Sequence, residues 1–306
     1  MAKRILIVVN KSWEADPLVA VFQNEQALPP NLPKSAKPPK VTITLNDGAT
    51  QTVDARLCLA SHNAAGDVLA TAEVWCIKNL MDLSSSKKAE ESSSFEKARV
   101  LGEMTKLGPS ADIVIAFGTA GFVDPRSHNG SVVVGTNVFV HNPHHSTPNS
   151  KSPWTDAGIG KLVDGSQQPI NEAAFSALDR ERASIEMRFI SPPISPAAPP
   201  ALIPAAAYVA LSNVNITDRT EYVWADPEAL RAFSAAEPKH SVGSVETTHG
   251  VIRLVMRSPQ FLFVSGIANR MGAFGIETAP RPYAQNFAAS HNAAVALAWM
   301  MPTLMA

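Results

Sequence analysis

Cysteine is scarce in this sequence, which has only Cys58 and Cys76 among its 306 residues. The two cysteines form no Cys-x-x-Cys motif, and no histidine-rich spacing lies around them. Neither a zinc-binding motif nor a disulfide framework is therefore visible. A single disulfide stays open, but two reduced thiols with apolar neighbours are favoured. We expect no metal site and no cofactor.

Charge is also sparse, since charged residues make up 17% of the chain and the formal net charge is −1. No basic surface that would attract nucleic acid or an anionic membrane is indicated. The apolar run at residues 5–9 is too short for a secretory leader, and the apolar C-terminal stretch is too short to span a bilayer and contains Pro302. These features predict a cytoplasmic protein that binds a small molecule rather than nucleic acid or a membrane.

The chain lacks the short motifs of several common enzyme classes. It has no Gly-x-Gly-x-x-Gly fingerprint, so a dinucleotide-binding fold has little support, and it has no P-loop. It also has no Gly-x-Ser-x-Gly nucleophile elbow and no Ser-His-Asp order. Nucleotide-binding folds of these two types and serine hydrolases are therefore disfavoured.

What the sequence does contain is an alternation of apolar strands and longer helical segments. Hydrophobic residues make up 45% of the chain, enough for a large core. The patterns predict strands at residues 5–9, 41–45, 55–60, 72–77, 111–117, 131–140, 205–214 and 260–267. They predict helices at residues 17–25, 95–107, 171–187, 241–257 and 284–301, and one that begins at 226–227. This alternation is typical of an α/β sandwich around a mostly parallel sheet.

Small and polar residues follow several of the predicted strands. The run ADIVIAF stops at Gly118, and residues 118–121 are predicted to form a bare turn where a ligand can approach the backbone. Small or polar residues also follow predicted strands at residues 10–14, 212–215 and 268–270. Glu246 lies near the first turn of the predicted helix 241–257. Because ligands of open α/β sheets bind beyond the carboxyl ends of the strands, we expect these segments to meet at one edge of the sheet.

Four motifs in a fixed order carry a family resemblance. FGTAGF at residues 117–122, GSVVVGTNVFVHN at 130–142, VETTHG at 245–250 and FVSGIANR at 263–270 precede an alanine-rich C-terminal helix. Together they resemble the nucleoside phosphorylase and nucleosidase superfamily, in particular methylthioadenosine/adenosylhomocysteine nucleosidases and purine nucleoside phosphorylases. The match begins at residue 3 and departs near residues 25–95 and 142–200.

The resemblance implies a fold and a reaction. It implies a three-layer α/β/α sandwich around a mixed, mostly parallel central sheet, formed by residues 1–306 as a single domain with loop insertions near 25–40 and 142–172. It further implies a homo-oligomeric enzyme that cleaves the N-glycosidic bond of a purine or related nucleoside. It leaves open the base, the 5′ substituent and the oligomeric state.

The resemblance also implies roles for three residues. Glu246, in a Val245-Glu246 pair where the family has Met-Glu, would accept hydrogen bonds from ribose hydroxyls. Asn269 stands where the family often has an aspartate that protonates the purine, and an amide can only donate a hydrogen bond there. Glu14 would activate water as a general base. The alternative for Glu246 and Glu14 is that each only stabilises the first turn of a helix, where negative charge is favourable. The alternative for Asn269 is that it only forms a turn after a strand.

Weaker implications concern binding residues and the nucleophile. The backbone of the glycine segment would hold the nucleophile or the base, and the residues after strand 205–214 would contact base and ribose; these candidates are Gly118, Thr119, Ala120, Gly121, Val214 and Asn215. The sequence lacks the two arginines with which the family's phosphorylases bind phosphate, and only Lys11 lies near the first of these positions. Hydrolysis is therefore favoured, while phosphate as co-substrate, and a noncatalytic nucleoside-binding protein, stay open.

Aromatic residues offer one further hypothesis. Trp154, Tyr222 and Trp224 could stack on a base, although aromatic side chains more often fill protein cores.

Overall fold

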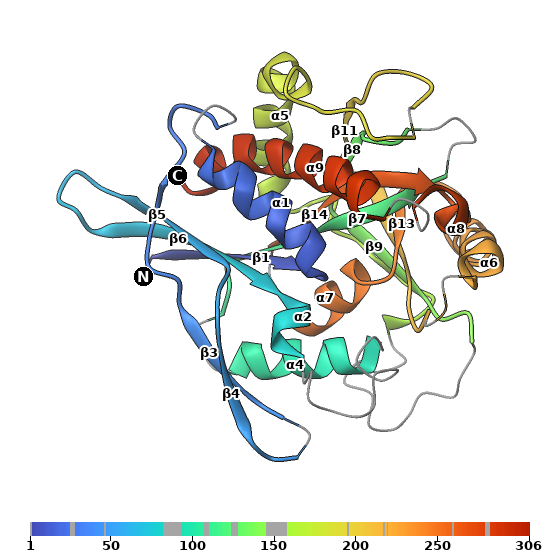
Figure 1. Cartoon of the computed structure of the whole chain (residues 1–306), viewed down its shortest axis with the longest axis horizontal. Coiled ribbons are helices and arrows are strands. Elements are labelled where there is room, and N and C mark those ends of the chain that lie inside the picture. Colours follow the sequence, from blue (N-terminus) through green and yellow to red (C-terminus); the bar gives the residue numbers. More distant parts are fainter. Residues whose placement is uncertain are drawn as a thin grey trace.

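Figure 1 shows the computed structural model of the chain. The residues that it describes are 2–24, 28–45, 47–81, 94–106, 110–123, 128–144, 158–194, 196–216, 218, 220–258, 260–278 and 282–306.

Within these residues, twelve strands form one mixed sheet and two more form a separate hairpin (Figure 1). The strands of the large sheet are β1 (Lys3–Val9), β2 (Lys34–Ser35), β5 (Leu57–His62), β6 (Val68–Cys76), β7 (Ile113–Phe122), β8 (Val132–Gly135), β9 (Asn137–His141), β10 (Leu162–Val163), β11 (Leu202–Pro204), β12 (Tyr208–Asn213), β13 (Ser241–Glu246) and β14 (Gln260–Arg270). The hairpin consists of β3 (Lys40–Thr44) and β4 (Thr50–Asp54).

Parallel pairing dominates the centre of the sheet. Strand β1 lies between β6 and β7 and is parallel to both, and β7 is parallel to β14 along most of its length. A second parallel group contains β9, β12 and β13. The two groups meet where Val245 of β13 pairs with Gly121 of β7. Antiparallel pairs occur at β5–β6, β2–β5, β9–β10 and β8–β14.

Helices cover both faces of this sheet, so the three-layer α/β/α prediction is confirmed (Figure 1). On one face lie α1 (Ser12–Gln23), α5 (Ile170–Glu186) and α9 (Pro282–Leu304), and on the other lie α2 (Ile77–Leu80), α4 (Ser94–Lys106) and α7 (His249–Met256). Helix α6 (Tyr222–Ala236) packs on β9, β12 and β13 beside the short helix α8 (Phe274–Glu277).

The sequence of β1 explains why two helical layers are needed. Ile5, Ile7 and Val9 face the layer of α1 and α9, whereas Leu6 and Val8 face the layer of α4 and α7. Successive side chains of a strand point to opposite faces, so a continuous apolar run can be buried only between two covers.

Several predicted boundaries were wrong. The strand at 111–117 does not end at Gly118, because β7 continues through residues 118–121 and its backbone pairs with β14. Helix α1 begins at Ser12 rather than at Pro17, since the Lys11 N–H donates to the Glu14 carboxylate and fixes the first turn earlier. Helix α6 begins at Tyr222, which places Asp226 inside the helix rather than at its start.

The predicted helix 241–257 was wrong over its first half. Residues 241–246 form β13 and only His249–Met256 are helical, so Glu246 ends a strand just before helix α7. Two further strand predictions differ: residues 131–140 split into β8 and β9, and β4 follows the NDG turn where no strand was predicted. Within the predicted loops, residues 34–35 form β2, whereas residues 145–157, including Trp154, lie outside the described part of the chain.

Candidate active site

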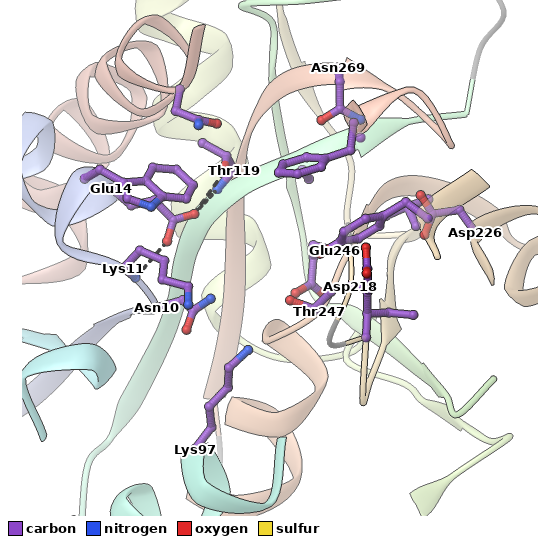
Figure 2. Close-up of a pocket in the computed structure, with 18 residues that line it drawn as sticks. Asn10, Lys11, Glu14, Lys97, Thr119, Asp218, Asp226, Glu246, Thr247 and Asn269 are labelled. Carbon is purple, nitrogen blue, oxygen red and sulfur yellow. Dashed lines mark hydrogen bonds between the residues drawn. The ribbon is translucent and has the colours of Figure 1, made fainter. Parts of the chain in front are cut away.

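A cavity of about 250 Å³ lies at the carboxyl ends of β1, β7, β13 and β14 (Figure 2). Its volume is just below the roughly 300–1,000 Å³ typical of small-molecule sites, so it fits one small ligand. Besides these strand ends, α4, the segment that leads into α6, and residues of α8 and α9 contribute to its walls. Elements separated by more than 200 residues in the sequence therefore form one site.

Glu14 lies in the first turn of α1 and is nearly fully buried in the cavity wall. Its Oε1 accepts hydrogen bonds from the Thr119 N–H at 2.7 Å and the Thr119 hydroxyl at 3.0 Å. Its Oε2 accepts the Lys11 N–H at 3.0 Å. Burial raises the pKa of Glu14, and the hydrogen bonds from Thr119 and Lys11 oppose that shift. The carboxyl group is thus rigidly held and has an increased affinity for a proton.

Gly118 explains how Glu14 comes so close to β7. A Cβ atom on Gly118 would lie 3.0 Å from Glu14 Oε1 and 3.5 Å from His249 Nε2. The glycine-rich segment is therefore bare because buried side chains of the site occupy the space beside it. This differs from the predicted turn, in which the ligand itself would approach the glycines.

Glu246 lies across the cavity from Glu14, at the end of β13 (Figure 2). Its Oε2 accepts the backbone N–H groups of Thr248 and, at 2.7 Å, His249, which begin helix α7. Its Oε1 is buried and accepts no hydrogen bond within the described structure. A helix N-terminus favours an anion at this position, so the carboxylate is fixed by one oxygen and can bind a ligand through the other.

Asn269 also lines the cavity, near the end of β14. Its amide nitrogen donates to the Arg270 carbonyl at 2.7 Å, and its oxygen accepts the Thr278 hydroxyl at 3.1 Å. One N–H of the amide is left for a ligand.

The structure thus brings Glu14, Glu246 and Asn269 to one cavity, together with Thr119, Ala120, Gly121 and Val245. Three predicted binding residues do not line it: Gly118, Val214 and Asn215. Val214 is buried in the core and its N–H donates to the His141 carbonyl, while the Asn215 N–H donates to the Ser94 hydroxyl. In this segment it is the residues that follow, Ile216 and Asp218, that line the cavity.

Sequence reasoning missed three charged residues of the cavity, which are Asp218, Lys97 and Asp226. Lys97 extends into it from α4, and Asp226 from α6, and both side chains are buried. Lys97 precedes Val100 by three positions and Met104 by seven, and this spacing places all three residues on the same apolar face of α4. The sequence therefore contained a signal that Lys97 is buried. Asp226 gave no such signal, because an Asp-Pro pair normally begins a helix.

The buried carboxyl group of Asp226 accepts N–H groups from the Asn213 amide at 3.2 Å and from the Gly272 backbone at 3.1 Å. Burial raises its pKa to about 6, against the opposing hydrogen bond from Asn213. An acid with this pKa can hold or release a proton near neutral pH.

Two aromatic rings form one wall of the cavity. Tyr222 and Phe274 both line it, with ring centroids 5.0 Å apart. Trp224, the other described aromatic candidate, is instead substantially exposed and contacts His144 edge-on. A flat apolar ligand group can therefore pack against Tyr222 and Phe274.

No group of three or more His, Cys, Asp or Glu residues in the described part of the chain is arranged to hold a metal ion. In the same residues, no helix has both the length and the apolar character needed to cross a bilayer. Cys58 and Cys76 are buried free thiols.

The fold is that of the nucleoside phosphorylase and nucleosidase superfamily, as the comparison with solved structures shows. Helicobacter pylori 5′-methylthioadenosine/S-adenosylhomocysteine nucleosidase, solved with a pyrrolidine-containing ligand, matches with a TM-score of 0.52 and 12% identity over 98% of this chain and 97% of that chain. A mutant of H. pylori futalosine hydrolase matches with a TM-score of 0.52 and 11% identity over 98% of both chains.

A third structure, the S-adenosylhomocysteine nucleosidase of Streptococcus pyogenes in complex with 5-methylthiotubericidin, matches with a TM-score of 0.50 and 14% identity over 99% and 98% of the two chains. No protein-family model matches the sequence, and no curated protein sequence matches it significantly. The family resemblance of the sequence motifs is thereby confirmed at the level of the fold.

Proposed function

We propose that this protein hydrolyses the N-glycosidic bond of a purine nucleoside. The observation that carries the proposal is the pair of buried carboxyl groups on opposite sides of one cavity, Glu14 held by Thr119 and Glu246 held by the first turn of α7. Breaking this bond generates positive charge on the sugar, requires a nucleophile at C1′ and releases the base with the bonding electrons. The cavity offers a group for each of these needs.

Glu246 would bind the sugar. Its Oε1 has no partner within the described structure and can accept a hydrogen bond from a ribose hydroxyl. As positive charge develops on the ring, a nearby carboxylate stabilises it by Coulomb attraction, which is strong in a site that excludes water. Glu246 would therefore contribute more in the transition state than in the ground state.

Glu14 would activate the water. The water oxygen forms a bond to C1′ while one of its protons moves to the Glu14 carboxylate. Because burial raises the pKa of Glu14, the carboxylate is a better proton acceptor than an exposed glutamate. The hydrogen bonds from Thr119 hold it in a fixed position, which lowers the entropic cost of the attack.

The base would lie against Tyr222 and Phe274, with the free N–H of Asn269 available to one of its acceptor atoms. An amide cannot release a proton, so the departing base must gain one elsewhere. Asp226 lines the same cavity and its pKa of about 6 lets it serve as that acid. Proton transfer from Asp226 balances the proton that Glu14 takes from water.

Phosphorolysis is the second candidate function. It is favoured by one observation, the presence of Lys11 and Lys97 in the same cavity, since phosphorolysis requires cations that bind phosphate. The two carboxyl groups favour water instead, because an anionic nucleophile would be repelled by them.

Free base released from adenosine, inosine and 5′-methylthioadenosine, measured with and without phosphate, tests the proposal. We expect release without phosphate. Glu246→Gln should lower kcat/KM about a hundredfold, which corresponds to about 3 kcal/mol of transition-state stabilisation. Glu172→Gln, which changes an exposed glutamate on α5, is the matched control and should leave the rate unchanged.

Two results would contradict hydrolysis of a nucleoside, and a third would contradict the role of Glu246. Release that requires phosphate would establish phosphorolysis. Binding of the nucleosides without any release of base would establish a noncatalytic binding protein. Equal rates for Glu246→Gln and Glu172→Gln would remove Glu246 from the site.

A further inference from the structure

His249 is a nearly fully buried histidine that adjoins both carboxyl groups of the proposed reaction. It begins α7, and its backbone N–H donates to Glu246 Oε2 at 2.7 Å. A Cβ atom at Gly118 would lie 3.5 Å from His249 Nε2 and 3.0 Å from Glu14 Oε1. The imidazole and the Glu14 carboxyl group therefore face the same point beside β7, although the proposed mechanism gives the imidazole no role.

The pairing of β7 with β14 explains why the imidazole reaches Gly118. Gly118 lies opposite Ser265 in the parallel register, and Ser265 Oγ lies 3.5 Å from His249 Nδ1. The Ser265 hydroxyl donates its own hydrogen to Ser244 Oγ of β13 at 3.1 Å, so it offers only lone pairs to Nδ1. This arrangement assigns the proton of a neutral imidazole to Nδ1 and leaves a lone pair on Nε2.

Nε2 of His249 has no hydrogen-bond partner among the residues that the structure describes, although the side chain is buried. The ring is held from the side by Phe263, with ring centroids 6.0 Å apart and ring planes 28° apart. A buried polar atom without a partner is costly, so its presence calls for an explanation. A protonated Glu14 carboxyl group would present a hydrogen to this lone pair, whereas the ionised carboxylate would be repelled by it.

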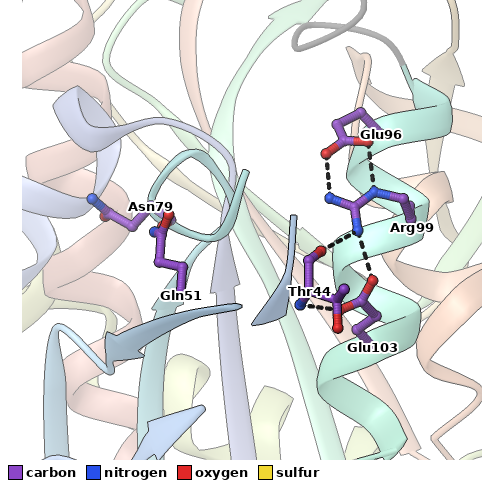
Figure 3. A network of polar contacts seen from close by, with 6 residues as sticks. All are labelled: Thr44, Gln51, Asn79, Glu96, Arg99 and Glu103. Carbon is purple, nitrogen blue, oxygen red and sulfur yellow. Dashed lines mark hydrogen bonds and ion pairs between the residues drawn. The ribbon is translucent and has the colours of Figure 1, made fainter. Parts of the chain in front are cut away.

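Helix α4 holds the start of α7, and with it the imidazole, in a defined place. Lys97 of α4 donates to the Thr248 hydroxyl at 2.9 Å, immediately before His249. Arg99 on the same helix attaches α4 to the β3–β4 hairpin through a network of short polar contacts with Glu96, Glu103 and Thr44 (Figure 3). The imidazole is therefore preorganised beside Gly118.

The charged groups around the imidazole set its protonation. Burial lowers the pKa of His249, and the Glu246 carboxylate opposes that shift. Lys97 contributes a charge from α4, and Lys11 contributes one from the start of α1, where it opposes the raised pKa of Glu14. Strands β7, β9 and β12 also pack against α7, and their ionisable side chains are those of His141 and Tyr208. The imidazole is therefore neutral at neutral pH, and its Nε2 is an acceptor.

We propose that His249 is a positioning residue of the hydrolysis, whose Nε2 lone pair faces Glu14 and stabilises that carboxyl group while it holds the proton taken from water. The inference rests on the proposed function, in which Glu14 accepts this proton. The water oxygen still bonds to C1′ and the proton still moves to Glu14, so no bond forms or breaks at His249. Because His249 does not line the cavity, it acts through Glu14 and not on the nucleoside.

Titration of the Glu14 carboxyl group, followed by NMR of isotopically labelled glutamate side chains in the full chain, tests this role. The Glu14 signal is identified by its absence in Glu14→Gln. His249→Phe keeps a ring against Phe263 but has no nitrogen, so the titration midpoint of Glu14 should fall by about half a pH unit or more. In base release from adenosine, the acidic limb of the pH–rate profile should move to lower pH as well. There kcat should fall about threefold to tenfold with little change in KM, because Glu14 becomes a weaker base.

Two further variants separate this role from packing. His249→Gln places an amide oxygen near the position of Nε2 and should restore the titration midpoint and most of kcat. Ser265→Ala removes the acceptor for the Nδ1 proton but keeps the histidine, so it should lower the midpoint in the same direction as His249→Phe. His62→Gln, which changes an exposed histidine of β5, is the matched control and should alter neither quantity.

The proposal is overturned if Glu14 titrates in His249→Phe as it does in the wild type, or if His249→Gln behaves like His249→Phe. Should His249→Phe fail to fold, an unshifted midpoint in Ser265→Ala overturns it in the same way. Base release by the wild type together with an unshifted titration refutes the role of His249 alone. A shifted titration without base release from any nucleoside refutes the hydrolysis alone, because the NMR signal does not depend on turnover.

Discussion

A single methyl group at Gly118 should impair the proposed hydrolysis without unfolding the protein. In Gly118→Ala the new Cβ would lie 3.0 Å from Glu14 Oε1 and 3.5 Å from Glu14 Cδ. An ordinary carbon–oxygen contact is longer, so the carboxylate must move away by a few tenths of an ångström. That movement acts directly on the 2.7 Å hydrogen bond from the Thr119 N–H.

The expected magnitude follows from this hydrogen bond. A hydrogen bond to a charged group contributes about 1.5–3 kcal/mol. If its alignment is needed when Glu14 accepts the proton from water, losing it should lower kcat roughly tenfold to a hundredfold, at about 1.4 kcal/mol for each factor of ten. KM should change less, since Glu14 contacts the water rather than the nucleoside in the proposed reaction.

Steady-state kinetics and thermal unfolding of the variant, measured together, check this reasoning. The matched control is Gly102→Ala, whose new Cβ meets no atom within 4 Å and which should leave kcat unchanged. An unchanged kcat in Gly118→Ala, or an equal loss of kcat in both variants, would refute the account of why this segment is bare.

Further predictions concern Glu14 itself and the packing of glycines. Glu14→Gln should abolish hydrolysis but retain nucleoside binding in calorimetry, and a normal rate would mean that water is activated elsewhere. In the wild type the rate should fall as the pH drops through the raised pKa of Glu14, because only the carboxylate accepts a proton; a pH–rate profile without this acidic limb would contradict the role. Gly266→Ala should destabilise the fold by about 3 kcal/mol or more in chemical denaturation, since its Cβ would lie 2.0 Å from the Ala289 carbonyl oxygen of α9. Its control, Gly102→Ala on α4, meets no atom within 4 Å and should add about 0.5–1 kcal/mol of stability; equal effects of the two substitutions would show that α9 yields to the methyl group.

The elements that the sequence predicted well are those with a strong local signal. The apolar runs of β1, β7 and β14 predicted buried strands, because a strand covered on both faces has few positions for polar residues. The long helices α5 and α9 were also found close to their observed bounds. In each case the residues of one segment were sufficient to define the type of element, whereas the end of β7 also depended on its pairing with β14.

Strand β13 shows where local reasoning failed. Residues 241–257 contain small residues and a helical period at their end, and the whole stretch was assigned to a helix. Gly243 has a tertiary role instead, because a Cβ there would lie 2.8 Å from the Val133 side chain and 2.9 Å from Tyr208. It also lies at the register shift between β12 and β13, as expected of a β-bulge. Neither contact is visible within the segment itself.

The sequence by itself determined the alternation of strands and helices, and hence the layered α/β fold, because burial on two faces and helical capping leave patterns within single segments. It also nominated Glu14, Glu246 and Asn269 through a resemblance of motifs. Only the tertiary structure decided that these residues share one cavity with Asp226 and Lys97, and that Gly118 makes room for Glu14. The distances between side chains from different segments depend on how the sheet and both helical layers pack together, and no single segment contains that information.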